Sequence, residues 1–155
     1  MKKLYCRSLQ LISIILIIFI AFSLLELLPA GIDLVFKNSY RGKLIWNIVA
    51  WIELMPILYC GYMCICIYEN IHNGKVFTSE NLNKLKIIRL TIIVNIFIVL
   101  ICNLLAGVLS LQNMYLLIIN ITFLLILAMS YAALSLICIL MYDAVNLQDD
   151  SDLTI

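Results

Sequence analysis

The chain alternates between four long apolar runs and three short polar breaks. The runs cover about residues 9–30, 44–68, 87–110 and 116–141. Each is long enough to cross the hydrocarbon core of a bilayer as an α-helix, which takes about 20 apolar residues for ~30 Å. The pattern therefore predicts an all-α integral membrane four-helix bundle, in which residues 1–155 form a single transmembrane domain.

The composition supports this class of protein. Of the 155 residues, 65% are hydrophobic and 12% are charged, whereas soluble domains have about 45–50% apolar and about 25% charged residues. The first run follows Lys2, Lys3 and Arg7, as the apolar core of a signal peptide would. However, it exceeds the ~7–15 residues of such a core, and no A-x-A-like cleavage site follows it. We expect the first run to be retained as a helix.

The basic residues are distributed unevenly between the two sides that a four-span chain defines. One side carries Lys2, Lys3, Arg7, Lys75, Lys84, Lys86 and Arg89, and the other carries Lys37, Arg41 and Lys43. Short loops rich in Lys and Arg stay in the cytoplasm. The distribution therefore predicts that both termini are cytoplasmic, N-in/C-in. The segment 69–86 is then a cytoplasmic loop, and 143–155 is an acidic cytoplasmic tail.

The predicted cytoplasmic loop has the features of an ordered turn. Asn73 and Gly74 form a turn signal, and Thr78 is a good N-cap for a helix that starts at the next residue. Glu80 then lies in the first helical turn, where a carboxylate suits the helix dipole. This helix is expected to follow the membrane surface and to enter the bilayer near Ile87. One interpretation of its basic residues is that they only anchor the helix to anionic headgroups.

Two segments on the predicted cytoplasmic side resemble motifs of a known family. One is the turn G-K-V-F-T-S-E-N at 74–81, and the other is the ending L-Q-D-D-S-D-L-T-I at 147–155. With the chain length and span number, they make the chain similar to an uncharacterised bacterial family of four-helix integral membrane proteins, the YoaS-like domain of unknown function. The positions that carry the resemblance are Gly74, Phe77, Thr78, Glu80, Asn81, Asp152, Leu153, Thr154 and Ile155.

The resemblance implies a location and a partner, and it implies no catalytic residue. Members are multi-pass proteins of the bacterial plasma membrane, and their genes often lie beside a small helix-turn-helix regulator. A cytoplasmic regulator protein is therefore an expected partner. Asp149 and Asp150 stand where glutamate is commoner in the family, which is a mild departure. The acidic tail could pair with the basic loop, add to a partner through Leu153–Ile155, or be disordered.

A few polar side chains interrupt the apolar runs at membrane depth, where such residues are expensive. Those expected in the outer half, and so able to share one intramembrane polar pocket, are Glu26, Asn47, Glu53, Asn103 and Asn120. Asn95 is expected deeper, toward the cytoplasm. Glu26 and Glu53 each precede a proline by three residues, and a proline bends a helix and frees a carbonyl. These two carboxyls could share a proton, or one could be neutral.

Three interpretations of these polar residues remain open at the level of sequence. They could be packing residues that make interhelical hydrogen bonds, each contributing about 0.6 kcal/mol on average. They could instead line a pocket for a ligand, an ion or a peptide. A proton-coupled transport site is the third interpretation.

The sequence offers no motif for catalysis or for a cofactor. No H-E-x-x-H, G-x-S-x-G, P-loop or G-x-G-x-x-G occurs, and His72 is the single histidine. Cys60 and Cys64 are spaced to share a helix face, close to Cys66, and could bind a soft metal. No third and fourth ligand is evident, so we expect no metal and no cofactor. No basic helix long enough for direct nucleic-acid binding is visible.

The sequence therefore predicts a small bacterial multi-pass membrane protein that is not an enzyme and that acts as a sensing or regulatory membrane partner. Its expected partners are the lipid bilayer and either a cytoplasmic regulator protein or a peptide, and a homo-oligomer is compatible with the pattern. One alternative is a self-protection (immunity-type) protein against a membrane-active peptide. The other is a small transporter or channel subunit.

Overall fold

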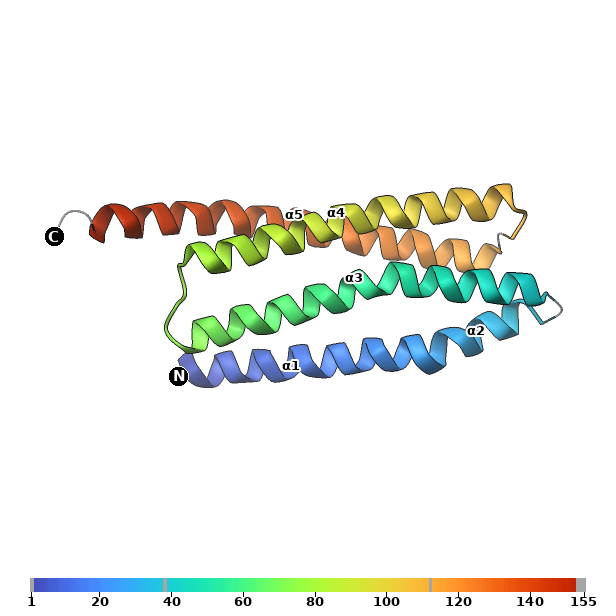
Figure 1. The fold of residues 1–155 in the computed structure, drawn as a ribbon, viewed down its shortest axis with the longest axis horizontal. Helices are drawn as coiled ribbons and strands as arrows, with labels where there is room; N and C mark the ends of the chain where they lie inside the picture. The colour runs from blue at the N-terminus through green and yellow to red at the C-terminus, as the bar shows by residue number, and fades with distance from the viewer. Residues whose placement is uncertain (1, 38, 112, 153–155) are drawn as a thin grey trace.

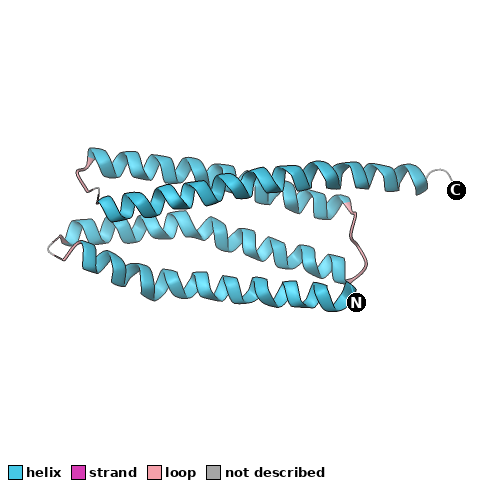
Figure 2. Ribbon diagram, turned by 180° about the vertical axis from the view of Figure 1, so that it is seen from behind, coloured by secondary structure: helices cyan, strands magenta, loops and turns pink. Residues whose placement is uncertain are grey.

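The computed structural model describes residues 2–37, 39–111 and 113–152, which form long helices (Figure 1). The elements are α1 (Lys2–Phe22), the π-helical turn η1 (Ser23–Leu27), α2 (Leu28–Val35), α3 (Tyr40–His72), α4 (Ser79–Val108) and α5 (Met114–Asp152). α1, η1 and α2 follow one another directly, so the described chain has four helical spans long and apolar enough to cross a membrane. No strand occurs in these ranges (Figure 2). The predicted all-α four-helix membrane bundle is confirmed.

The four spans run up and down and pack in chain order. α1 packs on α3, α3 on α4, and α4 on α5, whereas α1 and α5 do not pack against each other in the described part of the chain. The start of α1, the connection between α3 and α4, and the end of α5 lie at the same end of the molecule, on the left of Figure 1. We call this the terminal end and the opposite one the distal end. The bundle is open along the side between α1 and α5.

The helix of the first span continues past Pro29 as far as Val35. The π-helical turn makes this continuation possible. In it, the Leu28 N–H donates to the carbonyl of Ser23, five residues back. Pro29 then lies in the first turn of α2. Backbone N–H groups in this turn have no partner within the helix, so the missing N–H of proline removes no hydrogen bond. The chain bends at this point, and α2 rises toward α3 (Figure 1).

The helix of the fourth span also continues past residue 141, where its apolar run ends. α5 continues through the acidic segment as far as Asp152, so residues 143–152 are helix rather than a separate tail. A helix already formed in the membrane gains one backbone hydrogen bond with each further residue. This gain favours extension even where the side chains are acidic. The end of the predicted tail, Leu153 to Ile155, lies outside the described residues.

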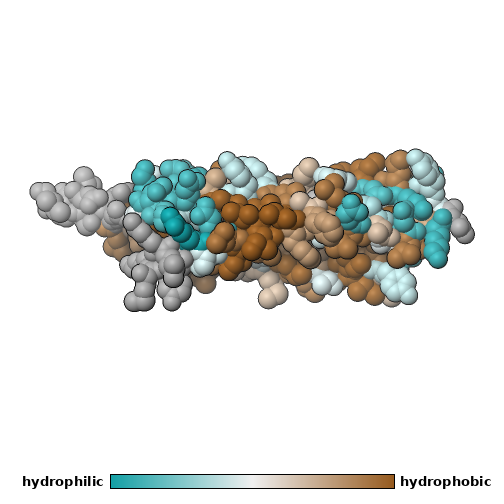
Figure 3. Space-filling model, turned by 90° about the horizontal axis from the view of Figure 1, so that it is seen from below, coloured by the Kyte–Doolittle hydropathy of each residue, from teal (hydrophilic) through white to brown (hydrophobic). Residues whose placement is uncertain are grey.

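On the face shown in Figure 3, an apolar belt lies between two polar ends. Large side chains are about 60% exposed on every span, for example Leu11 at 60%, Tyr62 at 60%, Phe97 at 59% and Leu125 at 62%. Monomeric soluble proteins rarely expose a continuous apolar surface of this kind. In a bilayer, lipid acyl chains would cover this apolar surface and keep it from water. The surface is therefore consistent with a multi-pass membrane protein.

Two clusters of buried residues form the interior. The first joins α3, α4 and α5 toward the terminal end, and its members are Cys60, Ile67, Ile88, Ile92, Val99 and Leu127. The second joins α2, α3, α4 and α5 near the distal end, and its members are Ile32, Trp46, Ala106 and Leu116.

Candidate functional site

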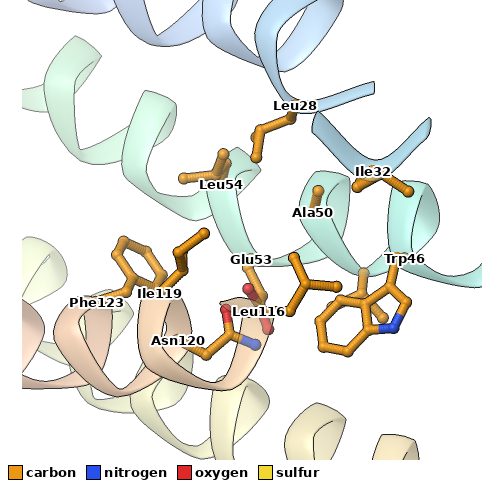
Figure 4. Close-up of a pocket in the computed structure, with 11 residues that line it drawn as sticks. Leu28, Ile32, Trp46, Ala50, Glu53, Leu54, Leu116, Ile119, Asn120 and Phe123 are labelled. Carbon is orange, nitrogen blue, oxygen red and sulfur yellow. The ribbon is translucent and has the colours of Figure 1, made fainter. Parts of the chain in front are cut away.

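A cavity of about 130 Å³ is lined by α2, α3 and α5 (Figure 4), and Ile32, Trp46 and Leu116 of the second cluster form part of its wall. Glu53 of α3 and Asn120 of α5 line it and extend toward each other. The other lining residues are apolar or aromatic, and they include Trp46 and Phe123. The cavity therefore presents one carboxyl and one amide to an otherwise apolar space.

Glu53 is the buried acidic residue of this site. Its exposed fraction is 6%, and its Oε1 atom is buried with no hydrogen-bond partner among the described residues. None of the residues that line the cavity is basic. Burying a charge costs a great deal of free energy unless the charge is paired. The cavity wall therefore offers no basic partner for a negative carboxylate.

Pro56 shapes the backbone that carries Glu53. It lies inside α3, where it cannot donate a hydrogen bond to the carbonyl of Ile52 and its ring crowds the preceding turn. α3 changes direction near its middle (Figure 1). The neighbouring carbonyl of Glu53 accepts a 3.0 Å hydrogen bond from Asn95 Nδ2. Asn95 of α4 thus stabilises the bent turn of α3 that carries the carboxyl.

Asn95 is itself completely buried, with an exposed fraction of 0%. Its Oδ1 atom, like the Glu53 Oε1 atom, has no hydrogen-bond partner in the described part of the chain. Two buried acceptors on adjacent helices are therefore unsatisfied at this depth. Each such group is expected to destabilise the fold by about 1–3 kcal/mol.

A pair of asparagines ties α5 to α4 beside the cavity. Asn120 Nδ2 donates to Asn103 Oδ1 at 3.0 Å, and Asn103 Nδ2 donates to the carbonyl of Val99 at 2.8 Å. Asn120 is 6% exposed. The two hydrogen bonds hold its amide in the cavity wall.

Three residues predicted for the pocket do not line this cavity. Glu26 is in the π-helical turn η1 and is exposed, and Asn47 is half-buried but does not line the cavity. Helix geometry gives the reason for Glu26, since residues two apart along a helix point to nearly opposite faces. Leu28 lines the cavity, so Glu26 points away from it. Of the five residues predicted for the pocket, Glu53 and Asn120 line this cavity, whereas Glu26, Asn47 and Asn103 do not.

Two residues that shape the site were not predicted to do so. Trp46 is 4% exposed, and its Nε1 donates to the carbonyl of Leu111 at 2.9 Å, which joins α3 to the connection before α5. Asn95 was expected nearer the cytoplasm, yet it contacts Glu53 directly. One pattern in the sequence could have indicated that Trp46 lies near Glu53. Trp46, Ala50 and Glu53 follow i, i+4, i+7 spacing, which places them on one helix face.

Asn81 holds the turn between α3 and α4, at the terminal end. Its side chain is completely buried, and its Nδ2 donates to the carbonyls of Lys75 at 2.7 Å and Val76 at 3.0 Å. Its Oδ1 accepts a hydrogen bond of 2.7 Å from Asn70 Nδ2. Because Asn70 belongs to α3, one side chain fixes the turn and connects the two helices.

The start of α4 agrees with the prediction. Thr78 is the N-cap, and its Oγ1 accepts a 3.3 Å hydrogen bond from the backbone N–H of Asn81. Glu80 Oε1 accepts hydrogen bonds from Lys84 Nζ at 2.6 Å and from Asn70 Nδ2 at 3.1 Å. The turn is therefore a rigid structure rather than a loose connection.

The remaining motif residues differ in what they contribute. Gly74 has φ = 83°, a left-handed conformation that strongly favours glycine. Phe77 is 49% exposed and Val76 is 38% exposed, so the ordered turn presents two apolar side chains. Asp152 ends α5. The other three tail residues of the motif lie outside the described residues.

The cysteines predicted to share a helix face lie within α3. Cys60 is buried and Cys64 is half-buried. The Cys60 thiol donates to the carbonyl of Ile88 at 4.0 Å. Among the described residues, no group of three or more His, Cys, Asp or Glu side chains could hold a metal ion.

A wider groove of about 560 Å³ follows the open side of the bundle, toward the terminal end. Side chains from α1, α3, α4 and α5 line it, and they are mostly apolar, with Ser13, Tyr68 and Ser130 among the exceptions. The groove is continuous with the apolar outer surface. Unlike the Glu53 cavity, it presents no charged side chain.

The fold and the site define a class, a multi-pass all-α membrane protein with a carboxyl-containing cavity within its bundle. Comparison with family models extends this to a family. The chain belongs to the family described as Protein of unknown function (DUF2975), whose model matches residues 4–155. No curated protein and no solved structure matches the chain.

Proposed function

We propose that this protein is a non-enzymatic membrane sensor that binds a small organic ammonium cation beside Glu53 and regulates a partner at its terminal end. One observation carries the proposal. The Glu53 carboxyl is 6% exposed, and its unpartnered Oε1 atom belongs to the wall of a cavity of about 130 Å³. Ionisable residues at membrane depth usually mark a site where something binds or passes.

The composition of the cavity wall favours an organic cation over a metal ion. Glu53 supplies negative charge, and Trp46 and Phe123 supply aromatic side chains, whose faces attract organic cations. The apolar lining suits a short hydrocarbon chain attached to the charged group. A calcium or magnesium ion prefers six or more oxygen ligands, whereas Glu53 and Asn120 are the residues of this wall with side-chain oxygens.

A continuous helix connects the cavity to the turn at the terminal end. α3 carries Glu53 on the cavity wall and Asn70 at the contact with Asn81. A ligand that changes the bend of α3 at Pro56 would therefore change the position of Asn70. The exposed Phe77 and Val76 beside it offer a surface for a partner. In this proposal the turn faces the cytoplasm of a bacterial cell, the protein lies in the plasma membrane, and the partner is a regulator protein.

The binding step can be measured by the fluorescence of Trp46. The chain has two tryptophans, and Trp51→Phe leaves Trp46, in the cavity wall, as the single reporter. Purified protein in a neutral detergent is titrated with ethylammonium, butylammonium or tetramethylammonium chloride, against sodium chloride at equal ionic strength. We expect a saturable fluorescence change with at least one of these cations.

Two matched variants decide whether the response depends on the cavity. Glu53→Gln removes the buried carboxyl and should abolish the saturable change. Glu26→Gln makes the same chemical change at an exposed position and should leave the response intact. Equal responses of Glu53→Gln and the parent protein, or no saturable response to any of the three cations, would contradict the proposal.

The regulatory step has a separate test. A tagged full-length protein is crosslinked in cells, and the captured proteins are compared between the wild type and Phe77→Ala. We expect a cytoplasmic regulator with the wild type and much less of it with the variant. Capture of a membrane-active peptide with tolerance to that peptide would favour self-protection instead. Cation flux into liposomes that is lost in Glu53→Gln would favour a transporter.

A further inference from the structure

We propose that the pocket formed by Lys86, Arg89 and Tyr142 at the terminal end is a binding site for the headgroup of an anionic phospholipid. A pocket of about 190 Å³ lies between α4 and α5, and its lining residues are Lys86, Arg89, Cys138, Ile139 and Tyr142. It is separate from the Glu53 cavity and shares no lining residue with it.

The two helices converge on this pocket with complementary faces. Lys86 and Arg89 are three residues apart on α4, which places them on one face. Cys138 and Tyr142 are four residues apart on α5 and share a face in the same way. Lys86 Nζ lies 5.9 Å from the centroid of the Tyr142 ring, which is within the range of a cation–π contact. The ring thus helps to hold the ammonium group at the pocket.

Both cations are available for an anion. The salt bridges among the described residues join Lys43 to Asp33 and Lys84 to Glu80, and neither involves the pocket. Asp143, next to Tyr142 on α5, is exposed and forms no ion pair with Lys86 or Arg89. An arginine guanidinium can bind a phosphate through two parallel hydrogen bonds, and a lysine adds a point charge.

The position of the pocket favours a phospholipid over free phosphate. Lys86 lies immediately before the apolar run of α4, and the apolar run of α5 ends just before Tyr142. The pocket therefore lies where the apolar belt meets the polar terminal end. Ile139 lies one turn deeper on α5 and is 58% exposed. The phosphate of a phospholipid would then bind Lys86 and Arg89, while its acyl chain would lie along Ile139. Basic pockets between membrane helices are known to bind anionic lipid headgroups.

The test is a lipid-binding measurement on the full-length protein. The protein is stripped of lipid in a neutral detergent, and native mass spectrometry measures its binding of phosphatidylglycerol and of phosphatidylcholine with the same acyl chains. We expect phosphatidylglycerol to bind more tightly. The double variant Lys86→Gln/Arg89→Gln should weaken its binding about 30-fold, or about 2 kcal/mol, because each basic side chain near an anionic surface contributes about 1 kcal/mol.

A charge-matched control is present at the same end of the molecule. Lys75→Gln/Lys84→Gln removes two basic residues outside the pocket and should keep most of the binding of phosphatidylglycerol. If the pocket variant does not fold, Arg89→Lys keeps the charge and removes the bidentate donor, and it should weaken binding several-fold. Equal binding of the two lipids by the wild type would overturn the proposal, as would undiminished binding by the pocket variant or by Arg89→Lys. Displacement of the lipid by millimolar inorganic phosphate would also overturn it, because the site would then be a phosphate site.

Discussion

Asparagine side chains join the helices of this bundle at several levels. Asn70 and Asn81 join α3 to α4 at the terminal end, Asn95 joins α4 to α3 at Glu53, and Asn120 joins α5 to α4. An amide can donate and accept at once, so one side chain can satisfy groups on two elements. Hydrogen bonds between membrane helices are individually weak, about 0.6 kcal/mol on average. Their main effect here is to fix which helix faces meet.

Asn81 is the residue of this set with the most hydrogen bonds, so its loss should be measurable. Asn81→Ala removes two bonds to backbone carbonyls and one from Asn70. We expect the free energy of unfolding in detergent to fall by about 2–3 kcal/mol, and protease cleavage after Lys75 to become faster. Asn83→Ala, at an exposed position on the same helix, should change stability by less than about 0.5 kcal/mol. Equal stability of the two variants would show that the turn does not depend on Asn81.

At the scale of the element, glycine and proline shape the first span and α3. η1 and Pro29 bend the first span toward α3, and Pro56 bends α3 where Glu53 lines the cavity. α1 approaches α3 at Gly61, where a Cβ atom would lie 2.7 Å from Ile17 Cγ1. Small residues allow membrane helices to approach closely. In the described chain α1 does not pack against α5. The contact at Gly61 is therefore important for holding α1 against the bundle.

Enlarging Gly61 should therefore separate α1 from α3. Gly61→Ala is expected to lower the free energy of unfolding by about 1–3 kcal/mol through overpacking. The effect should be smaller in an Ile17→Ala background, because the two residues are in contact. Gly31→Ala is the control, since beyond its chain neighbours and its own helix backbone no atom lies within 4 Å of the added Cβ, and it should be neutral or stabilise by up to about 1 kcal/mol. Thermal unfolding of the variants in one detergent measures both effects, and a neutral Gly61→Ala would disprove the close approach.

The sequence predicts the number of spans and the start of α4 because general rules govern these features. The bilayer thickness sets the length of an apolar run, and Thr78 caps α4 through a local hydrogen bond. The sequence does not predict which helix face points inward. In a membrane both the interior and the lipid are apolar, so hydropathy does not distinguish the two faces. Glu26 and Glu53 have the same spacing to a proline, yet one is exposed and the other is buried.

At the scale of the whole molecule, the two ends of the bundle differ in content. The terminal end carries the Asn81 turn and the pocket of Lys86 and Arg89, and the distal end carries the ion pair of Lys43 with Asp33 at 3.2 Å. The Glu53 cavity lies between them, toward the distal end. The proposed cation-binding cavity is therefore separate from the end proposed to meet a partner and lipid headgroups. This separation requires the terminal end to face the cytoplasm, as the basic residues predict.

Thiol labelling of cells tests this orientation. In a background without the other cysteines, Cys6 should react with a membrane-impermeant maleimide only after the cells are opened. Lys37→Cys, at an exposed position of the distal end, should react in intact cells when it replaces Cys6 as the single cysteine. Labelling of Cys6 from outside would place the Asn81 turn on the wrong side for a cytoplasmic partner.

If Glu53 is present for binding, as we propose, it should lower the stability of the empty protein. The most direct measurement is the thermal unfolding of Glu53→Leu against the wild type, each with and without the ammonium cation that binds the wild type. Leucine fills a similar volume without a buried unsatisfied acceptor, so we expect the empty variant to be more stable by about 1–3 kcal/mol. It should gain no stability from the cation, whereas the wild type should gain. A less stable Glu53→Leu, with the same response to the cation as the wild type, would show that Glu53 is a packing residue and would contradict the account.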